Sequence, residues 1–152
     1  MLHFQYLLQT QTLEPKKEWV IRIVLGRLGD IDAAEWCIRQ VRNMGMNDLV
    51  VFELVPDLVF MEYKPAVGFL LEAIMKDERN CSSPNPDSNT SINCAYRILE
   101  LVAPIIAGFP VEADEDGELL TNDYKESLEQ AREWIVRNQD DFSLKNSSVR
   151  LN

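Results

Sequence analysis

The stretch VEADEDGELLTND, residues 111–123, carries carboxylates at alternating positions, as calcium-binding loops do. An EF-hand loop supplies oxygen ligands at positions 1, 3, 5, 7, 9 and 12 and has glycine at position 6. If Glu112 stands at position 1, Gly117 falls at position 6 and Asp123 at position 12. The candidate calcium ligands are then Glu112, Asp114, Asp116, Glu118 and Asp123.

Both ends of this stretch depart from the calcium-binding pattern. Glu112 is longer than the expected Asp, and Asp123 is shorter than the Glu that closes an EF-hand with two oxygens. Pro110 would also break the last turn of an incoming helix, at a cost of roughly 3 kcal/mol. An acidic connector explains the same residues, because Asp116-Gly117 favours a tight turn. The sequence favours the connector, with a calcium site as the alternative.

Two of the three cysteines bracket the polar loop CSSPNPDSNTSINC and are candidates for a disulfide. A bridge between Cys81 and Cys94 would stabilise the fold by roughly 3 kcal/mol in the chain-entropy model. It would imply an extracytoplasmic location, whereas a reducing cytosol would keep both as thiols, and the sequence leaves the two cases open. Cys37 lies in a helical apolar pattern and is predicted to be a small buried side chain.

Catalytic motifs are missing from the sequence, so no catalytic residue is predicted. The single histidine, His3, has no acidic or nucleophilic partner nearby in the sequence. GxSxG, P-loop and Rossmann patterns do not occur. A pair of carboxylates acting as acid and base remains as an enzymatic hypothesis.

Composition predicts one acidic domain. The chain has 152 residues, of which 46% are hydrophobic, and this is enough for one core. Its net charge of −10 argues against binding to nucleic acid or anionic lipid, since both require a basic surface. No apolar run is long enough to cross a bilayer, and the opening residues do not resemble a signal peptide. The acidity favours a solvated face, with a cationic protein partner as the alternative.

Helices are expected to position these residues, because apolar side chains recur with helical spacing along most of the chain. Pro15 suits the first turn of a helix, Asp30 or Asp32 can cap the next, and Pro56 and Pro104 are expected to kink or restart two others. Thr121, Asn122 or Asp123 is expected to cap the last helix. The predicted helices cover residues 15–28, 33–43, 48–63, 65–78, 92–108 and 123–138, within a single domain over residues 1–142 that is followed by a polar tail over 143–152.

Two of these helices share one apolar stripe at an offset of 33 residues. Such an offset between paired helices is typical of a stacked α-solenoid, in which each pair buries its apolar face against the next. Tyr124, Leu128, Ala131 and Ile135 are expected to form the stripe of a third pair. The matching stripes are Ala33, Ala34, Cys37, Ile38 and Val41 in the first helix, and Ala66, Val67, Leu70, Leu71 and Ile74 in the second.

The segment LGRLGDIDAAEWCIRQV resembles a HEAT-like repeat of the phycobilisome-lyase type. KPAVGFLLEAIMKDE resembles a second copy, and TNDYKESLEQAREWIV resembles a degenerate third. The resemblance implies an all-α solenoid of about three antiparallel helix pairs that serves as an interaction module or scaffold. The family has no shared catalytic residues that could be placed on this chain.

Three hypotheses of function follow. The first is a non-enzymatic module that binds an unidentified protein partner and needs no cofactor. The partner would be cationic if the acidic stretch over residues 111–123, called the acidic loop below, takes part in binding. The second is an extracytoplasmic helical domain stabilised by calcium and by the bridge between Cys81 and Cys94. The third is a helical enzyme that uses paired carboxylates.

Overall fold

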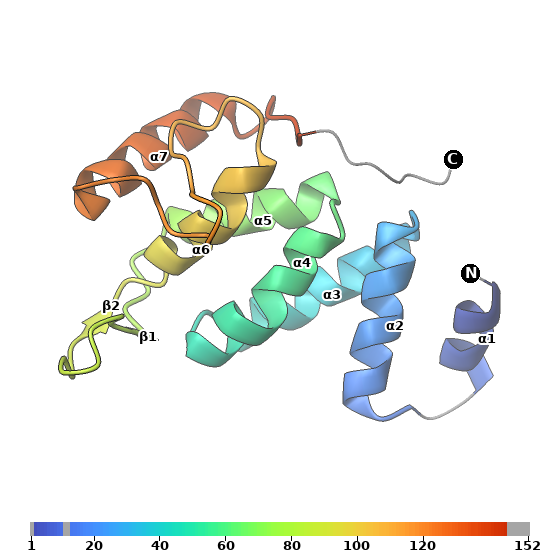
Figure 1. The fold of residues 1–152 in the computed structure, drawn as a ribbon. Helices are drawn as coiled ribbons and strands as arrows, with labels where there is room; N and C mark the ends of the chain where they lie inside the picture. The colour runs from blue at the N-terminus through green and yellow to red at the C-terminus, as the bar shows by residue number, and fades with distance from the viewer. Residues whose placement is uncertain (1, 11–12, 146–152) are drawn as a thin grey trace.

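The computed structural model describes residues 2–10 and 13–145, and these residues are mostly helical (Figure 1). This confirms the all-α prediction at the level of fold class, with one two-stranded sheet as the exception. The elements are α1 (Leu2–Thr10), α2 (Pro15–Arg27), α3 (Ile31–Met44), the π-helix η1 (Val50–Leu54), α4 (Val55–Phe60), α5 (Lys64–Ile74), β1 (Cys81–Ser82), β2 (Ser91–Ile92), α6 (Ala95–Val102), the 3-10 helix η2 (Ala103–Ile105) and α7 (Tyr124–Asn138).

Local signals set the boundaries of α2 and α3. α2 begins at Pro15 as predicted, and Gly29 turns the chain after it with a φ of 104°. Asp30, rather than Asp32, caps α3, because its carboxylate accepts a hydrogen bond of 3.0 Å from the backbone N–H of Ala33. The cap satisfies a backbone donor that would otherwise lack a partner at the helix start.

Pro56 interrupts the helix predicted over residues 48–63, as expected. The chain forms η1 and then continues as α4, and the N–H of Val55 donates to the carbonyl of Val50 in the five-residue step of a π-helix. A proline lacks the amide hydrogen that a regular helix needs, and the wider turn accommodates this loss.

Pro104 ends a helix instead of kinking it, so the predicted helix over residues 92–108 was wrong in its second half. α6 stops at Val102 and η2 follows it. Ile106 then forms an antiparallel bridge with Leu144, and the N–H of Lys145 donates to the carbonyl of Ile105 at 2.8 Å. Residues 143–145 are therefore paired to the fold, although the sequence assigns them to the tail; residues 146–152 lie outside the described part of the chain.

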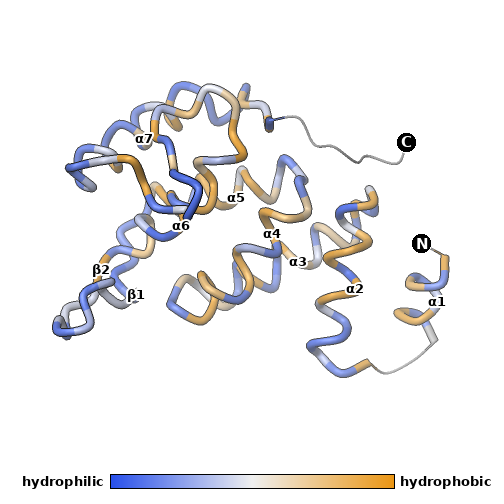
Figure 2. Tube along the Cα trace, viewed as in Figure 1, coloured by the Kyte–Doolittle hydropathy of each residue, from blue (hydrophilic) through white to orange (hydrophobic). Residues whose placement is uncertain are grey.

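The matching apolar stripes of α3 and α5 both lie in the core. All ten of their residues are buried, which confirms that the offset of 33 identifies the inward faces. Figure 2 shows the corresponding alternation of hydrophobic and hydrophilic positions around these helices. In α7, Leu128, Ala131 and Ile135 are buried as predicted, but Tyr124 is 44% exposed.

Helices that follow one another along the chain pack side by side. α1 packs on α2, α2 on α3, α3 on α5, α5 on α6 and α6 on α7, while α4 contacts α2, α3, α5 and α6. The β1–β2 hairpin projects from the end of the molecule that carries α6 and α7 (Figure 1). None of the helices in residues 2–10 and 13–145 has both the length and the hydrophobicity of a membrane span.

The helix α1 is absent from the sequence prediction. Its Gln5 donates a hydrogen bond of 3.0 Å from Nε2 to Oδ2 of Asp30, the residue that caps α3. The opening residues contain no proline, glycine or acidic cap that marks a helix start, so the local pattern carries little signal.

Candidate functional site

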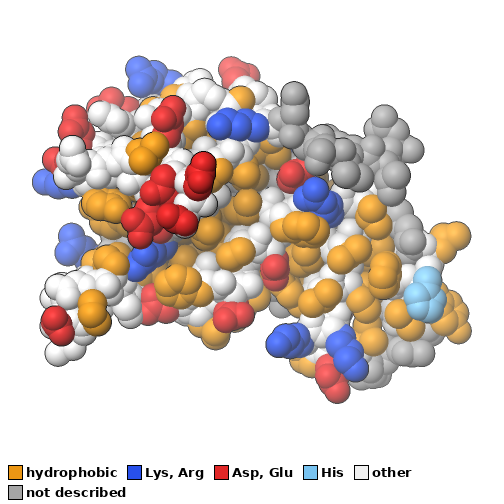
Figure 3. Space-filling model, in the orientation of Figure 1, with side chains coloured by type: hydrophobic (Ala, Val, Ile, Leu, Met, Phe, Trp, Pro, Cys, Tyr) orange, Lys and Arg blue, Asp and Glu red, His pale blue; other side chains and the backbone are white. Residues whose placement is uncertain are grey.

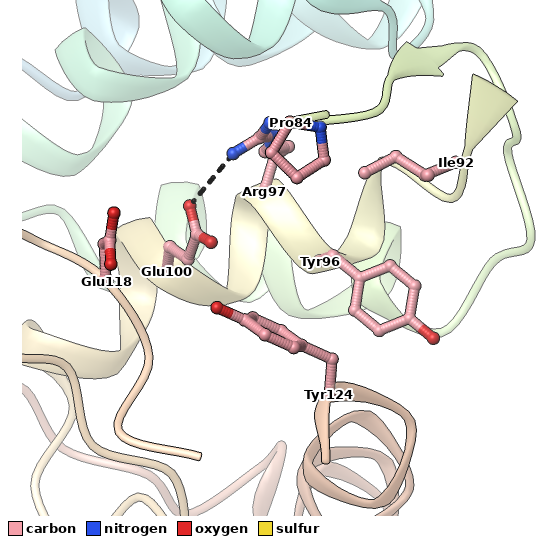
Figure 4. Close-up of a pocket in the computed structure, with 7 residues that line it drawn as sticks. All are labelled: Pro84, Ile92, Tyr96, Arg97, Glu100, Glu118 and Tyr124. Carbon is pink, nitrogen blue, oxygen red and sulfur yellow. Dashed lines mark ion pairs between the residues drawn. The ribbon is translucent and has the colours of Figure 1, made fainter. Parts of the chain in front are cut away.

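A cavity of about 310 Å³ lies between the β1–β2 hairpin, α6, the acidic loop and the first residue of α7 (Figure 4). This volume is at the lower end of the range found for ligand-binding pockets. The residues that line the cavity are Pro84, Ile92, Tyr96, Arg97, Glu100, Glu118 and Tyr124.

The hairpin wall of the cavity is fixed by a disulfide. Cys81 and Cys94 are bridged, with Cα atoms 5.1 Å apart and both side chains buried; the sequence alone leaves this bridge and two free thiols as open alternatives. Cys81 lies opposite Ile92 in the β1–β2 pair, so the bridge lies next to a residue of the cavity wall. Asp48 also accepts hydrogen bonds from the N–H and the hydroxyl of Ser82, and these bonds lower the pKa of Asp48.

The floor of the cavity comes from α6. Tyr96 and Glu100 are one helical turn apart, and Arg97 lies beside them. Nη1 of Arg97 is 3.6 Å from Oε2 of Glu100, which is an ion pair without a short hydrogen bond. Nε of Arg97 is buried and has no hydrogen-bond partner in the described chain. A guanidinium carries five N–H donors, so Arg97 is incompletely satisfied by the protein.

Glu100 is electrostatically unusual. Burial in the cavity raises its pKa, since removal from water disfavours the charged form; Arg97 opposes this rise and Glu118 adds to it. Two carboxylates, Glu100 and Glu118, thus face one cavity together with a single guanidinium, which is paired with Glu100 (Figure 4). Such a site favours a ligand that brings positive charge.

The acidic loop turns back on itself and brings Glu118 to the cavity. Oδ1 of Asp114 accepts hydrogen bonds from the N–H groups of Asp116 and Glu118, at 2.9 and 3.0 Å. Gly117 has a φ of 83°, which glycine adopts without strain, and Leu119 is buried below. The predicted tight turn at Asp116-Gly117 is confirmed.

The five calcium candidates do not form a metal site in the described structure. Asp114 uses one oxygen to hold the turn, Glu118 lines the cavity, and Asp123 caps α7 by accepting from the N–H of Glu126 at 3.0 Å. Glu112 lies instead in a depression with Pro110. Among residues 2–10 and 13–145, no three His, Cys, Asp or Glu side chains are placed to hold a metal ion. Calcium binding stays a prediction.

Two tyrosines form the aromatic side of the cavity. The rings of Tyr96 and Tyr124 meet edge to face, with centroids 6.5 Å apart. In Figure 4 the hydroxyl of Tyr124 is directed toward the side of the cavity that holds Glu100. Helical spacing assigns Tyr124 to the core, but as the first residue of α7 it is only partly covered: its ring contacts Tyr96 of α6 and it lines the cavity.

The side of the cavity that faces the loop between η2 and α7 is acidic. Asp and Glu side chains gather over the loop that connects η2 and α7 in Figure 3, while hydrophobic side chains gather over α2 and α4. Residues 109–123 contain six Asp or Glu and no Lys or Arg. A cationic group that approaches the cavity from the side of this loop therefore meets a favourable field.

Other groups that sequence reasoning considered for chemistry lie away from this cavity. His3 contacts the ring of Phe4, with centroids 6.1 Å apart. Cys37 is buried in α3 as predicted, and burial raises the pKa of its thiol to about 12, so it stays protonated and unreactive.

The chain was also compared with known proteins. No family model matches it, and no curated protein and no solved structure matches it significantly.

Proposed function

We propose that this protein is a non-enzymatic interaction module that binds a positively charged side chain of a partner protein in the cavity between the hairpin and α6. The observation that carries the proposal is Glu100, a partly desolvated carboxylate that faces the cavity together with Glu118. An ammonium group from a partner would supply a positive charge that balances these two carboxylates.

The walls of the cavity suit a lysine side chain. The rings of Tyr96 and Tyr124 offer the electron-rich faces and the apolar surface that a methylene stem and its ammonium group prefer. Arg97 is already paired with Glu100, which leaves Glu118 as the exposed carboxylate that meets the ligand first. A carboxylate-based enzyme would need the same two groups, and no observation favours that use over binding.

We further propose that the helices form a HEAT-like stack that presents this cavity at one end. The common apolar stripe of α3 and α5, and the packing of α2 on α3 and of α4 on α5, support two helix pairs. Stacked pairs commonly act as rigid supports for partner-binding surfaces.

A peptide titration tests the binding proposal. Acetylated, amidated GGKGG, GGQGG and GGEGG are titrated into the 15N-labelled protein at pH 7.5 and low salt, and amide shifts are followed by NMR. GGKGG is expected to shift the amides of α6 and of residues 109–124 and to bind most tightly. Loss of binding at high salt is expected as well, because exposed charges are screened.

Three variants sharpen the test. Glu100→Gln is expected to weaken GGKGG binding about tenfold, as a hydrogen bond to a charged group contributes about 1.5 kcal/mol or more. Glu118→Gln, at an exposed position, is expected to weaken it about two- to fivefold without affecting the fold. Glu14→Gln, exposed before α2, carries the same charge change and serves as the control. Equal shifts with GGKGG and GGQGG, or equal losses in Glu118→Gln and Glu14→Gln, would overturn the proposal.

A further inference from the structure

A second cavity, of about 460 Å³, adjoins the first. The two cavities share Ile92 and Tyr96 as a common wall. The second is built by residues after α5, by the end of the hairpin and by α7, and its charged lining residues are Asp77, Arg79, Lys125, Glu129 and Arg132.

The charges of the second cavity are unequally engaged. Arg132 is held in place, because its guanidinium donates to the carbonyl of Ile74 at 2.9 Å and to Oδ1 of Asp77 at 2.9 Å. Asp77 also accepts a hydrogen bond from Nδ2 of Asn93 at 2.9 Å, so its charge is satisfied within the protein. The pKa of Asp77 is lowered chiefly by Arg132, as this arrangement requires.

Two cations in the second cavity remain for a ligand. Arg79 and Lys125 are exposed, and in the described part of the chain neither lies within ion-pair distance of a carboxylate, although the charge of Arg79 contributes to the lowered pKa of Asp77. Three Lys or Arg side chains line this cavity against two Asp or Glu, whereas the first cavity has one Arg against two Glu. The two adjacent cavities therefore have opposite net charge.

We infer that the partner segment is bipolar: it carries a lysine side chain for the first cavity and, a few residues away, a carboxylate side chain for the second. Arg79 and Lys125 would bind the carboxylate, and the chain between the two charges would cross Tyr96 and Ile92. This inference rests on the proposed function, since it adds an anionic anchor to the same peptide. Charge complementarity of this kind fixes the direction in which a segment lies as well as its affinity.

Peptides with separated charges test the inference. The test peptides are acetylated and amidated and carry Lys and Glu separated by one to four Gly. An extended chain spans at most about 3.3–3.6 Å per residue, so the series varies the distance between the two charges and identifies the best spacer. Matched peptides carry Lys with Gln, Gln with Glu, and Gln with Gln. The best Lys and Glu peptide is expected to bind about tenfold more tightly than its Lys and Gln counterpart, as for a charge-assisted hydrogen bond.

Protein variants assign the gain to the second cavity. In the double variant Arg79→Gln/Lys125→Gln, the Lys and Glu peptide is expected to lose its gain in affinity over the Lys and Gln peptide. Binding of the Lys and Gln peptide is expected to stay intact. The control is the double variant Lys16→Gln/Lys17→Gln. Both residues are exposed on α2, which lies at the other end of the molecule in Figure 1. This variant makes the same charge change and should keep the gain in affinity.

The outcomes separate this inference from the proposed function. If the Lys and Glu peptide binds no better than the Lys and Gln peptide, or if the gain persists in Arg79→Gln/Lys125→Gln, the inference is overturned and the proposed function survives. If the Lys and Gln peptide binds no better than the Gln and Gln peptide, the proposed function fails. Amide spectra of each variant confirm that the fold is retained.

Discussion

Removal of the bridge between Cys81 and Cys94 is expected to lower the free energy of unfolding by about 3 kcal/mol. The two cysteines are 13 residues apart in sequence, and the chain-entropy model gives about 3 kcal/mol at 25 °C for a closed loop of about 15 residues. Both cysteines are buried, so the variant Cys81→Ala/Cys94→Ala avoids placing a hydroxyl where it would lack a partner.

Urea unfolding, followed by far-ultraviolet circular dichroism, measures this loss. Wild type and variant are each unfolded with and without a phosphine reductant, and the wild type should lose stability with reductant whereas the variant should not respond. The slope with urea is also expected to rise when the bridge is absent, because the unfolded chain exposes more surface. A wild-type loss below about 1 kcal/mol, or an equal response in the variant, would refute the entropic reasoning.

The same perturbation tests whether the hairpin shapes the cavity. Pro84 and Ile92 lie within the bridged segment and line the cavity. The variant Cys81→Ala/Cys94→Ala, under conditions where it remains folded, is expected to bind GGKGG several-fold more weakly, because the wall is no longer fixed before binding. Unchanged affinity in the folded variant would show that α6 and the acidic loop suffice.

Three further predictions concern helix caps, the core and pH. Asp30→Ala is expected to lower the free energy of unfolding by about 1 kcal/mol, because the N–H of Ala33 loses its acceptor, and thermal or urea melts measure this against Asp32→Ala as the control. Leu70→Ala, at a fully buried site of α5, is expected to cost about 2–5 kcal/mol in the same assay, and a loss below about 1 kcal/mol would mean that the site is not close-packed. The pKa of Glu100 is raised above 4.5, so the folded state holds its proton more tightly than the unfolded state. The resulting contribution to stability is present below pH 4.5 and is lost as pH rises through the folded pKa. Affinity for GGKGG should rise over the same pH window. Glu100→Gln should abolish that part of both pH dependences, and profiles that match the wild type would contradict the assignment.

The features that the sequence predicts correctly depend on residues that are close together in the chain. Pro15 begins a helix through backbone chemistry that acts within one turn, and this helix start was predicted. Pro56 disrupts its helix as predicted, although the sequence does not show that the disruption takes the form of a π-helix. The Asp116-Gly117 turn and the bridged cysteines were likewise visible, because each depends on residues close in sequence.

The sequence does not predict the environment of a residue whose neighbours in space are distant in the chain. Helical period alone places Tyr124 in the core, yet at the first turn of α7 it contacts Tyr96 of α6 and remains 44% exposed beside the cavity. Residues 143–145 show no strand pattern, and they are attached to the fold by their pairing with residues 105–107 and by the packing of Leu144 against the core.

The sequence by itself determined the helical class, the inward faces of α3 and α5, and the acidity of the loop, since period, caps and charge are written in consecutive residues. Only the tertiary structure decided that Ile92, Tyr96, Glu118 and Tyr124, from the hairpin, α6, the loop and α7, share one cavity. Their proximity depends on how separate elements pack, and no local preference of the chain specifies it. The acidic loop, which looks like an ion site in sequence, contributes through Glu118 to a cavity that other elements complete.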